Sequence, residues 1–254
     1  MKRIFSSIPL LAGIGIVGLV LSLTSCLKDK NDSGNNNDVS AGLMAFNLAP
    51  SQSTAGFKIG GNVVTQFPLA YNNYTSVYLP IFPGTRTIDA FSFSSGNTLA
   101  TASGSFETGK FYSVFLVGTD STLENVIVRD NFDSLSSSGK SYVRYINAIA
   151  DASSPTVTIA SGSTNVVNES ASFKTVSEFK TIDAGSVNVT VTNGGTINAN
   201  RTITLEAGKV YTVLLIGKPG GTGDNAVQVK FIANGQVDNN AGRMSSAAAN
   251  RAGN

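Results

Sequence analysis

Few side chains in this sequence could carry out nucleophilic or acid–base chemistry. The chain has 254 residues, contains no histidine, and has a single cysteine, Cys26. This composition excludes Ser-His-Asp and Cys-His nucleophilic sites, and it excludes zinc sites built on histidine or cysteine. The segment Gly220-Gly-Thr-Gly223 is glycine-rich, but no predicted helix follows it to bind a phosphate. We therefore expect a protein that is not an enzyme and that binds no cofactor.

Carboxylates near the middle of the chain raise the question of calcium. Asp130, Asn131 and Asp133 place oxygen atoms within one turn, where they could meet at one cation. The segment lacks the full Asp-x-Asp-x-Asp-Gly loop and its distal glutamate. A solvated turn is therefore the favoured interpretation, calcium is the alternative, and we assign no metal site.

The single cysteine has a different use. Lys2 and Arg3 precede an apolar run, residues 8–23, that is shorter than the roughly 20 residues of a membrane-spanning helix. The run ends in Leu23-Thr24-Ser25-Cys26, which resembles the lipobox of bacterial lipoproteins. The resemblance implies cleavage after residue 25, a lipid on Cys26, and a membrane as partner. Residues 1–25 are then a signal peptide, and the polar segment 26–40 is predicted to be a disordered tether.

The charge of the processed chain argues against nucleic acid as a partner. Removing Lys2 and Arg3 from the 18 basic residues leaves 16, which equals the 16 acidic residues. The remaining lysines and arginines form no basic patch or stripe of the kind that nucleic-acid binding requires.

Two short patterns resemble signals used by Bacteroidetes. Leu27-Lys28-Asp29 resembles the export signal that sends some lipoproteins to the outer face of the outer membrane. Asp120-Ser121-Thr122 and Asp133-Ser134-Leu135 resemble O-glycosylation acceptors, which makes Ser121 and Ser134 candidate modification sites. We expect a lipid-anchored protein of the cell envelope, at the outer membrane and exposed at the cell surface.

An internal duplication organises the rest of the chain. Phe106–Gly118 matches Leu205–Gly217 with an offset of 99 residues, and pairing Phe46 with Tyr145 in the opening segments gives the same offset. A period of this length is about one β-sandwich domain. The sequence predicts two tandem domains, residues 41–136 and 137–233, followed by a disordered tail over residues 234–254.

The pattern within each copy is that of β-strands. Val187, Val189 and Val191 alternate with polar residues, which is the period of a half-buried strand. Tyr112 and Tyr211 each follow Gly-Lys-x, a segment that resembles the entry to strand F of immunoglobulin-like domains, where a tyrosine hydroxyl bonds back to nearby backbone. The predicted fold class is all-β, with two tandem immunoglobulin-like β-sandwiches and two structural tyrosine corners.

The lipobox, the asparagine-rich tether and the duplicated Asn-x-Ala…Gly-Lys-x-Tyr-[Ser/Thr]-Val scheme together resemble the bacterial domain-of-unknown-function family 4397. The resemblance covers about residues 42–233 and implies an exported protein with immunoglobulin-like domains and no established activity. It departs from the family in the first copy, where Gln52-Ser53 replaces an acidic residue that Asp151 retains in the second.

Loops at the ends of the sandwiches hold the candidates for binding. Tyr71-Asn72-Asn73-Tyr74 is the richest cluster of aromatic and amide groups, and such groups suit the apolar face and the hydroxyls of a sugar ring. The alternative is that these aromatics cover the core. We expect a non-catalytic binding or adhesion module for a glycan or an envelope protein. The alternative is a spacer or assembly subunit that pairs through exposed edge strands.

Overall fold

A computed structural model describes residues 40–136, 139–237 and 244–245. The signal peptide, Cys26, segment 27–39 and most of the predicted tail lie outside these ranges. The described residues form β-strands and two short 3-10 turns, Asp120–Thr122 and Gly223–Asn225. Within them, no helix has the length and apolar character needed to cross a membrane.

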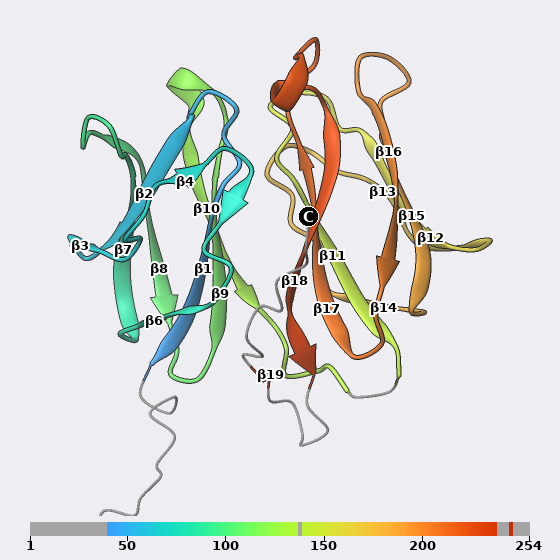
Figure 1. The fold of residues 1–254 in the computed structure, drawn as a ribbon, viewed down its shortest axis with the longest axis horizontal. Helices are drawn as coiled ribbons and strands as arrows, with labels where there is room; N and C mark the ends of the chain where they lie inside the picture. Colours follow the sequence, from blue (N-terminus) through green and yellow to red (C-terminus); the bar gives the residue numbers. More distant parts are fainter. Residues whose placement is uncertain (1–39, 137–138, 238–243, 246–254) are drawn as a thin grey trace, which may run out of the picture. The chain divides into compact units, whose positions relative to one another are not determined.

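The first copy, which we call repeat one, is a sandwich of two sheets (Figure 1). One sheet has the strand order β10-β9-β1-β5, with β6 also paired to β1. The other has the order β3-β2-β7-β8, with β4 also paired to β2. The strands are β1 (Ala41–Asn47), β2 (Thr54–Ile59), β3 (Asn62–Val63), β4 (Leu69–Ala70), β5 (Asn73–Tyr74), β6 (Leu79–Ile81), β7 (Gly84–Ser92), β8 (Thr98–Phe106), β9 (Phe111–Val117) and β10 (Glu124–Asp130).

Repeat two is a second sandwich, with sheets ordered β14-β11-β17-β18-β19 and β13-β12-β15-β16. The strands are β11 (Ser141–Asn147), β12 (Thr156–Ser161), β13 (Thr164–Ser170), β14 (Lys180–Ile182), β15 (Gly185–Thr192), β16 (Asn198–Leu205), β17 (Lys209–Ile216), β18 (Gln228–Val237) and β19 (Met244–Ser245). The all-β prediction of two sandwiches is confirmed. Residues 234–237, assigned to a disordered tail from their composition, instead complete strand β18.

The alternation that predicted a strand in repeat two is seen in β15. Val187, Val189 and Val191 are fully buried, whereas Ser186 and Asn188 on the opposite face are exposed. One face of this sheet therefore builds the core, and the other is open to solvent, as expected for an alternating strand.

The first strand of each repeat pairs in parallel with the strand that carries the predicted corner tyrosine. β1 is parallel to β9, and β11 is parallel to β17. This pairing differs from the fully antiparallel sheets of an immunoglobulin constant domain. It places each opening strand in the middle of its sheet, so that both of its edges are paired.

The strand pairing corrects the alignment of the two opening segments. Leu43 lies opposite Tyr112 in repeat one, and Val143 lies opposite Tyr211 in repeat two. The opening strands are therefore equivalent at an offset of 100, and pairing Phe46 with Tyr145 was wrong by one residue. A shift of one residue reverses the face of every side chain in a strand. Phe46 accordingly points away from its own sandwich core, whereas Tyr145 points into its own.

The described residues build more than the two expected cores. Each sandwich has its own buried cluster, around Phe57 in repeat one and around Val189 in repeat two. A third cluster combines residues of β1 and β9 with residues of β11, β17 and β18. Its buried members are Met44, Phe46, Leu48, Phe115, Val117, Ile146, Ala148, Leu214, Ile216 and Ile232. The two repeats thus share a hydrophobic core, and their described residues belong to one compact unit.

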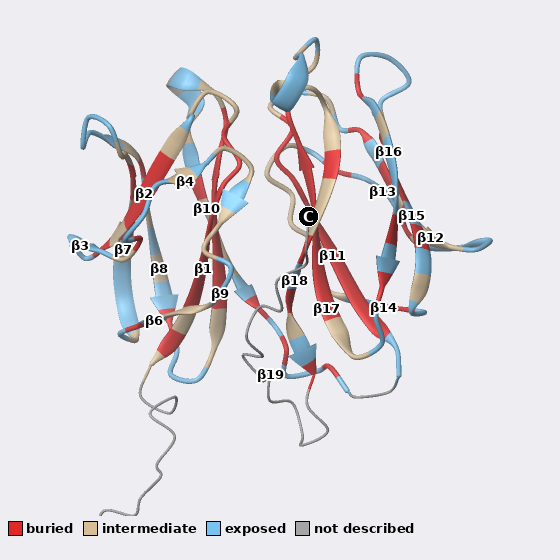
Figure 2. Ribbon diagram, in the orientation of Figure 1, coloured by how far each residue is buried: buried red, intermediate tan, exposed pale blue. Residues whose placement is uncertain are grey.

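This shared cluster explains why the central strands are apolar on both faces. β1, β9, β11 and β17 are buried along nearly their whole length (Figure 2). Strands buried on both faces have continuous apolar runs instead of an alternating pattern. Each repeat therefore has a core of its own and also buries the second face of its central strands in the shared cluster.

Candidate functional site

Among the described residues, the largest group of connected buried polar side chains lies between the two repeats, beside the shared core. Arg144 on β11 and Asp130 at the end of β10 form an ion pair, with 2.6 Å between Nη2 and Oδ1. The two side chains are 2% and 0% exposed. A buried ion pair is tolerated only where further hydrogen bonds satisfy the remaining polar atoms.

Those further hydrogen bonds are present on the guanidinium. Arg144 Nε donates to Thr212 Oγ1 at 3.0 Å, and Nη2 donates to Ser113 Oγ at 3.1 Å. Ser113 and Thr212 are equivalent residues of β9 and β17, so each repeat contributes one hydroxyl. The guanidinium also lies over the ring of Phe179, 4.5 Å from its centroid.

The remaining hydrogen bonds of the network start from the carboxylate of Asp130. Asp130 Oδ2 accepts hydrogen bonds from Ser113 Oγ at 2.7 Å and from the Tyr78 hydroxyl at 2.6 Å. The Tyr78 oxygen accepts from Asn234 Nδ2 at 3.1 Å, and Asn234 Oδ1 accepts from Thr212 at 2.6 Å. Burial, followed by the charge of Asp130, holds the pKa of Tyr78 well above its ordinary value. The phenol therefore stays neutral and acts as a donor.

This network has a structural role. Its hydroxyls and amides bond to one another, and both charges are paired out of reach of solvent. Asp130 was predicted in a solvated turn, and its burial corrects that prediction. A sequence signal was present, because Arg144 interrupts the otherwise apolar run Tyr142–Ile146.

The other acidic residue of the predicted turn is engaged separately. Asp133 accepts hydrogen bonds from Lys110 Nζ at 2.8 Å and from Arg129 Nη2 at 2.9 Å. The hydrogen bond from Lys110 is the main cause that lowers the pKa of Asp133. Asp130 and Asp133 thus face different cationic side chains. Within the described ranges, no group of three acidic, histidine or cysteine side chains could hold a metal ion.

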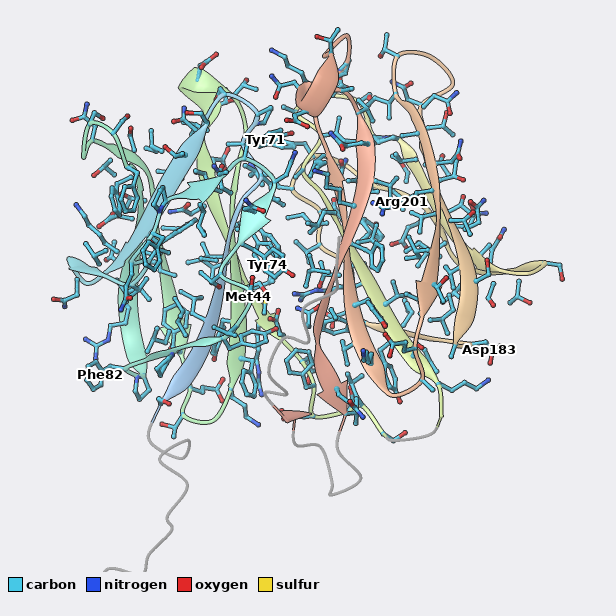
Figure 3. The ribbon with its side chains drawn as sticks, in the orientation of Figure 1. Met44, Tyr71, Tyr74, Phe82, Asp183 and Arg201 are labelled. Atoms are coloured by element: carbon cyan, nitrogen blue, oxygen red, sulfur yellow. The ribbon has the colours of Figure 1, made fainter. Side chains whose placement is uncertain are left out.

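The predicted ligand cluster at residues 71–74 lies largely in packing contacts (Figure 3). Tyr74 stacks on Phe46, with ring centroids 5.3 Å apart, and packs against the shared core. Burial is the main cause that raises the pKa of Tyr71 to about 12, and the nearby backbone of Gly217 opposes this shift.

The amides of this cluster differ in their exposure. Asn72 has a positive φ of 67° and donates its backbone N–H to Asn47 O at 2.8 Å. Asn73 is exposed. Tyr74 therefore packs against the shared core, and ligand binding by residues 71–74 stays a prediction.

The two predicted corner tyrosines occupy equivalent sites. The Tyr112 hydroxyl accepts a hydrogen bond from Glu107 N–H at 2.9 Å, and the Tyr211 hydroxyl accepts one from Glu206 N–H at 3.0 Å. Their rings are buried, at 4% and 3% exposure. Each hydroxyl thus bonds to backbone five residues upstream, at the turn that enters the strand.

The candidate modification sites lie in turns. Ser121 belongs to the 3-10 turn Asp120–Thr122, and Ser134 is exposed between the buried residues Phe132 and Leu135. O-glycosylation of either residue stays a prediction, as does lipidation of Cys26, which lies outside the described residues.

Comparison with known families accounts for the duplication. The model of the domain of unknown function DUF4397 matches residues 41–157 and again residues 141–250. The chain belongs to this family. The two DUF4397 matches begin at β1 and β11, so each includes one parallel pair and one corner tyrosine.

Other comparisons add little to the DUF4397 assignment. No curated protein matches the chain. Among solved structures, it is similar to one described as a "putative cell adhesion protein" from Bacteroides eggerthii, at 12% identity. That match covers 78% of this chain and 95% of the other, with a TM-score of 0.21.

One surface of the second DUF4397 repeat was not identified from sequence. The outward residues of sheet β13-β12-β15-β16, which we call the polar face, carry hydroxyls and amides and no charge. They are Thr156, Thr158, Ala160, Asn168, Ser170, Ser186, Asn188, Thr190, Thr192, Asn198, Asn200, Thr202 and Thr204. The sequence signal was the polar half of the same alternation that predicted the buried valines.

Proposed function

We propose that this protein is a non-catalytic binding module of the cell envelope, anchored through lipid on Cys26. The polar face is the observation that carries this proposal. It is a sheet surface that no other described strand covers, and its polar groups are uncharged hydroxyls and amides. Such a surface offers many hydrogen-bonding groups but no activated nucleophile, so it suits adhesion better than catalysis.

Anchoring is tested by fractionation of the bacterium that produces the protein. Wild-type protein should sediment with membranes, and Cys26→Ala should be soluble and unlipidated. Several acyl chains make release negligible, because each buried CH₂ contributes about 0.8 kcal/mol. Soluble, unlipidated wild-type protein would contradict the anchor.

Binding is tested with a labelled soluble chain that begins at residue 27. We expect saturable binding to envelope preparations, without turnover of any component. The matched control is the same soluble chain with a bulky tag attached to the polar face, and it should bind less than the untagged chain. Binding that does not saturate, or release of cleaved products, would contradict the proposed function.

A second candidate function, an assembly subunit, is favoured by the open sheet edges. β8, β13 and β16 are terminal strands of their sheets among the described residues, with nine, seven and eight residues. Unpaired edges of this length can add a strand from another chain. Ordered oligomers in light scattering of the soluble chain would favour this function, and a concentration-independent monomer would favour the binding module.

A further inference from the structure

The polar face is a regular array because its residues are in register across four strands. Thr158 lies opposite Asn168 on one side and Thr190 on the other, and Thr190 lies opposite Asn200. A second row joins Ser170, Thr156, Thr192 and Asn198 in the same way. Neighbouring strands lie about 4.8 Å apart, and residues on one face of a strand recur about every 6.7 Å. The array therefore offers evenly spaced hydroxyls and amides.

Most of these groups are available to a ligand. Among the described residues, the hydrogen bonds of this face engage only Thr158 with Asn168 at 3.3 Å, Thr192 with the Gly194 N–H at 3.1 Å, and Ser170 with Ser154 O at 2.9 Å. A hydroxyl can donate one hydrogen bond and accept two, and an amide offers both donors and an acceptor. The face can thus bond to a partner that itself has both kinds of group.

The chemistry of the face excludes most classes of partner. The buried centre of a protein interface is enriched in aromatic residues, methionine and arginine, and the face has none of these, with Ala160 as its one apolar residue. Nucleic acids and anionic polysaccharides need lysine or arginine against their charges, and the face has neither. A lipid surface needs apolar side chains that insert. A neutral polysaccharide needs uncharged donors and acceptors over an extended surface, which is what the face provides.

The corresponding outer surface of repeat one is different. On sheet β3-β2-β7-β8, Lys58 lies over the ring of Phe91 at 4.7 Å, and Asp89 accepts a hydrogen bond from Thr101 at 2.7 Å. The ring of Phe91 stacks on Phe93, with centroids 5.5 Å apart. Charge and aromatic groups interrupt this surface, so it is the natural control for the polar face.

We propose that the polar face of repeat two binds a neutral polysaccharide lying across strands β12, β13, β15 and β16. This inference rests on the proposed function and gives it a ligand class and a site. Because the face has no aromatic ring on which a sugar could stack, each sugar unit contributes little to the binding free energy. Retention then comes from many hydrogen bonds repeated along one polymer.

The test is affinity electrophoresis, which detects weak binding to polymers. The soluble chain from residue 27 is run in native gels that contain dextran, a neutral β-glucan or yeast mannan. A gel with polygalacturonate is the anionic comparison, and a gel without polymer is the reference. We expect retardation in at least one neutral gel and none in polygalacturonate.

Two matched triple variants locate the site. Thr158→Ala/Thr190→Ala/Asn200→Ala removes three of the four polar side chains in one row of the polar face. It should weaken retention at least about tenfold, as expected for losing three ordinary hydrogen bonds. Thr85→Ala/Thr87→Ala/Ser103→Ala removes similar groups from the outer surface of repeat one and should leave retention unchanged. Thermal melting followed by circular dichroism verifies that both variants are folded.

Three results would overturn the inference. They are equal retention of the two triple variants, retardation by polygalacturonate alone, and no retardation in any of the three neutral gels. If no neutral polymer retards the chain but the labelled chain still binds envelope preparations saturably, the ligand class is wrong and the proposed function stands. If the chain shows neither retardation in neutral gels nor saturable binding to envelope preparations, the proposed function is wrong as well.

Discussion

Met44 of repeat one and Arg144 of repeat two occupy equivalent positions on their opening strands, and both face the shared core. Met44 is 1% exposed and packs among apolar side chains, whereas Arg144 brings a guanidinium to the same surface. Its charge is compensated by Asp130, which comes from repeat one. The two copies have diverged into a complementary pair, so neither repeat alone satisfies the charges of the interface.

Other equivalent residues have kept their roles. Asn47 donates Nδ2 to Gln52 O and Leu69 O, and Asn147 donates Nδ2 to Ala171 O. Each asparagine Oδ1 accepts the backbone N–H of the residue two positions on. The corner tyrosines also have the same partners in both copies. Residues that shape a single sandwich are thus conserved between the repeats, and residues that join the sandwiches differ.

The largest effect is expected when the repeats are separated. Chains limited to residues 40–136 and 139–237 keep their own cores but expose the shared cluster and leave Arg144 and Asp130 unpaired. Separation exposes both charges to water, so the main loss is the burial of the shared apolar cluster, at about 25 cal/mol per Å² of apolar surface. Each half should melt well below the whole chain and should associate when the halves are mixed, as measured by calorimetry. Halves that melt at the temperature of the whole chain would show that the shared core contributes nothing.

The next largest effect is expected when the Arg144–Asp130 ion pair is broken. Arg144→Met gives repeat two the residue of repeat one and leaves Asp130 buried without its cation. We expect a loss of about 3 to 5 kcal/mol in the free energy of unfolding, measured by urea denaturation. Arg144→Met combined with Asp130→Asn removes both charges and should recover more than half of this loss. No recovery in the double variant would mean that the arginine acts through packing and not through charge.

The corner tyrosines should give smaller, equal effects in the two repeats. Tyr112→Phe and Tyr211→Phe each remove one hydrogen bond to a backbone N–H while keeping the ring, which should cost about 1 kcal/mol. Urea denaturation measures both variants, and each serves as the control for the other. An effect confined to one repeat would indicate that the two corners are not equivalent.

The smallest effect concerns alkaline pH. Tyr71 of repeat one is equivalent to Phe173 of repeat two, because Asn72 and Lys174 both have positive φ and donate to Asn47 and Asn147. The fold raises the pKa of Tyr71 from 10.0 to about 12. The unfolded chain therefore releases this proton first, and stability present below pH 10 is lost as pH rises toward 12.

Tyr71→Phe should reduce the loss of stability between pH 10 and pH 12, as measured by urea unfolding across that interval. Tyrosinate absorbance near 295 nm should show one fewer late-titrating phenol. An unchanged pH dependence would place the alkaline sensitivity on the other buried tyrosines.

The sequence by itself determined the local features of each sandwich. Alternation around Val189 predicts a half-buried strand, and Gly-Lys-x-Tyr predicts a turn before Tyr211, because both patterns act over a few residues. The absence of histidine likewise excludes whole classes of site wherever the chain folds. The polar face was implicit in the same alternation, although only the register across four strands assembled it into an array.

Only the tertiary structure determined which residues of the two repeats contact each other. The partner of Arg144 is Asp130 from the other copy, and the stacking of Tyr74 on Phe46 depends on β5 pairing with β1. An apolar run such as β11 has no alternation to show which face is inward, so its alignment could slip by one residue unnoticed. Only pairing with β17 sets that register, because hydrogen bonds between strands and contact with a second sheet are properties of the folded chain.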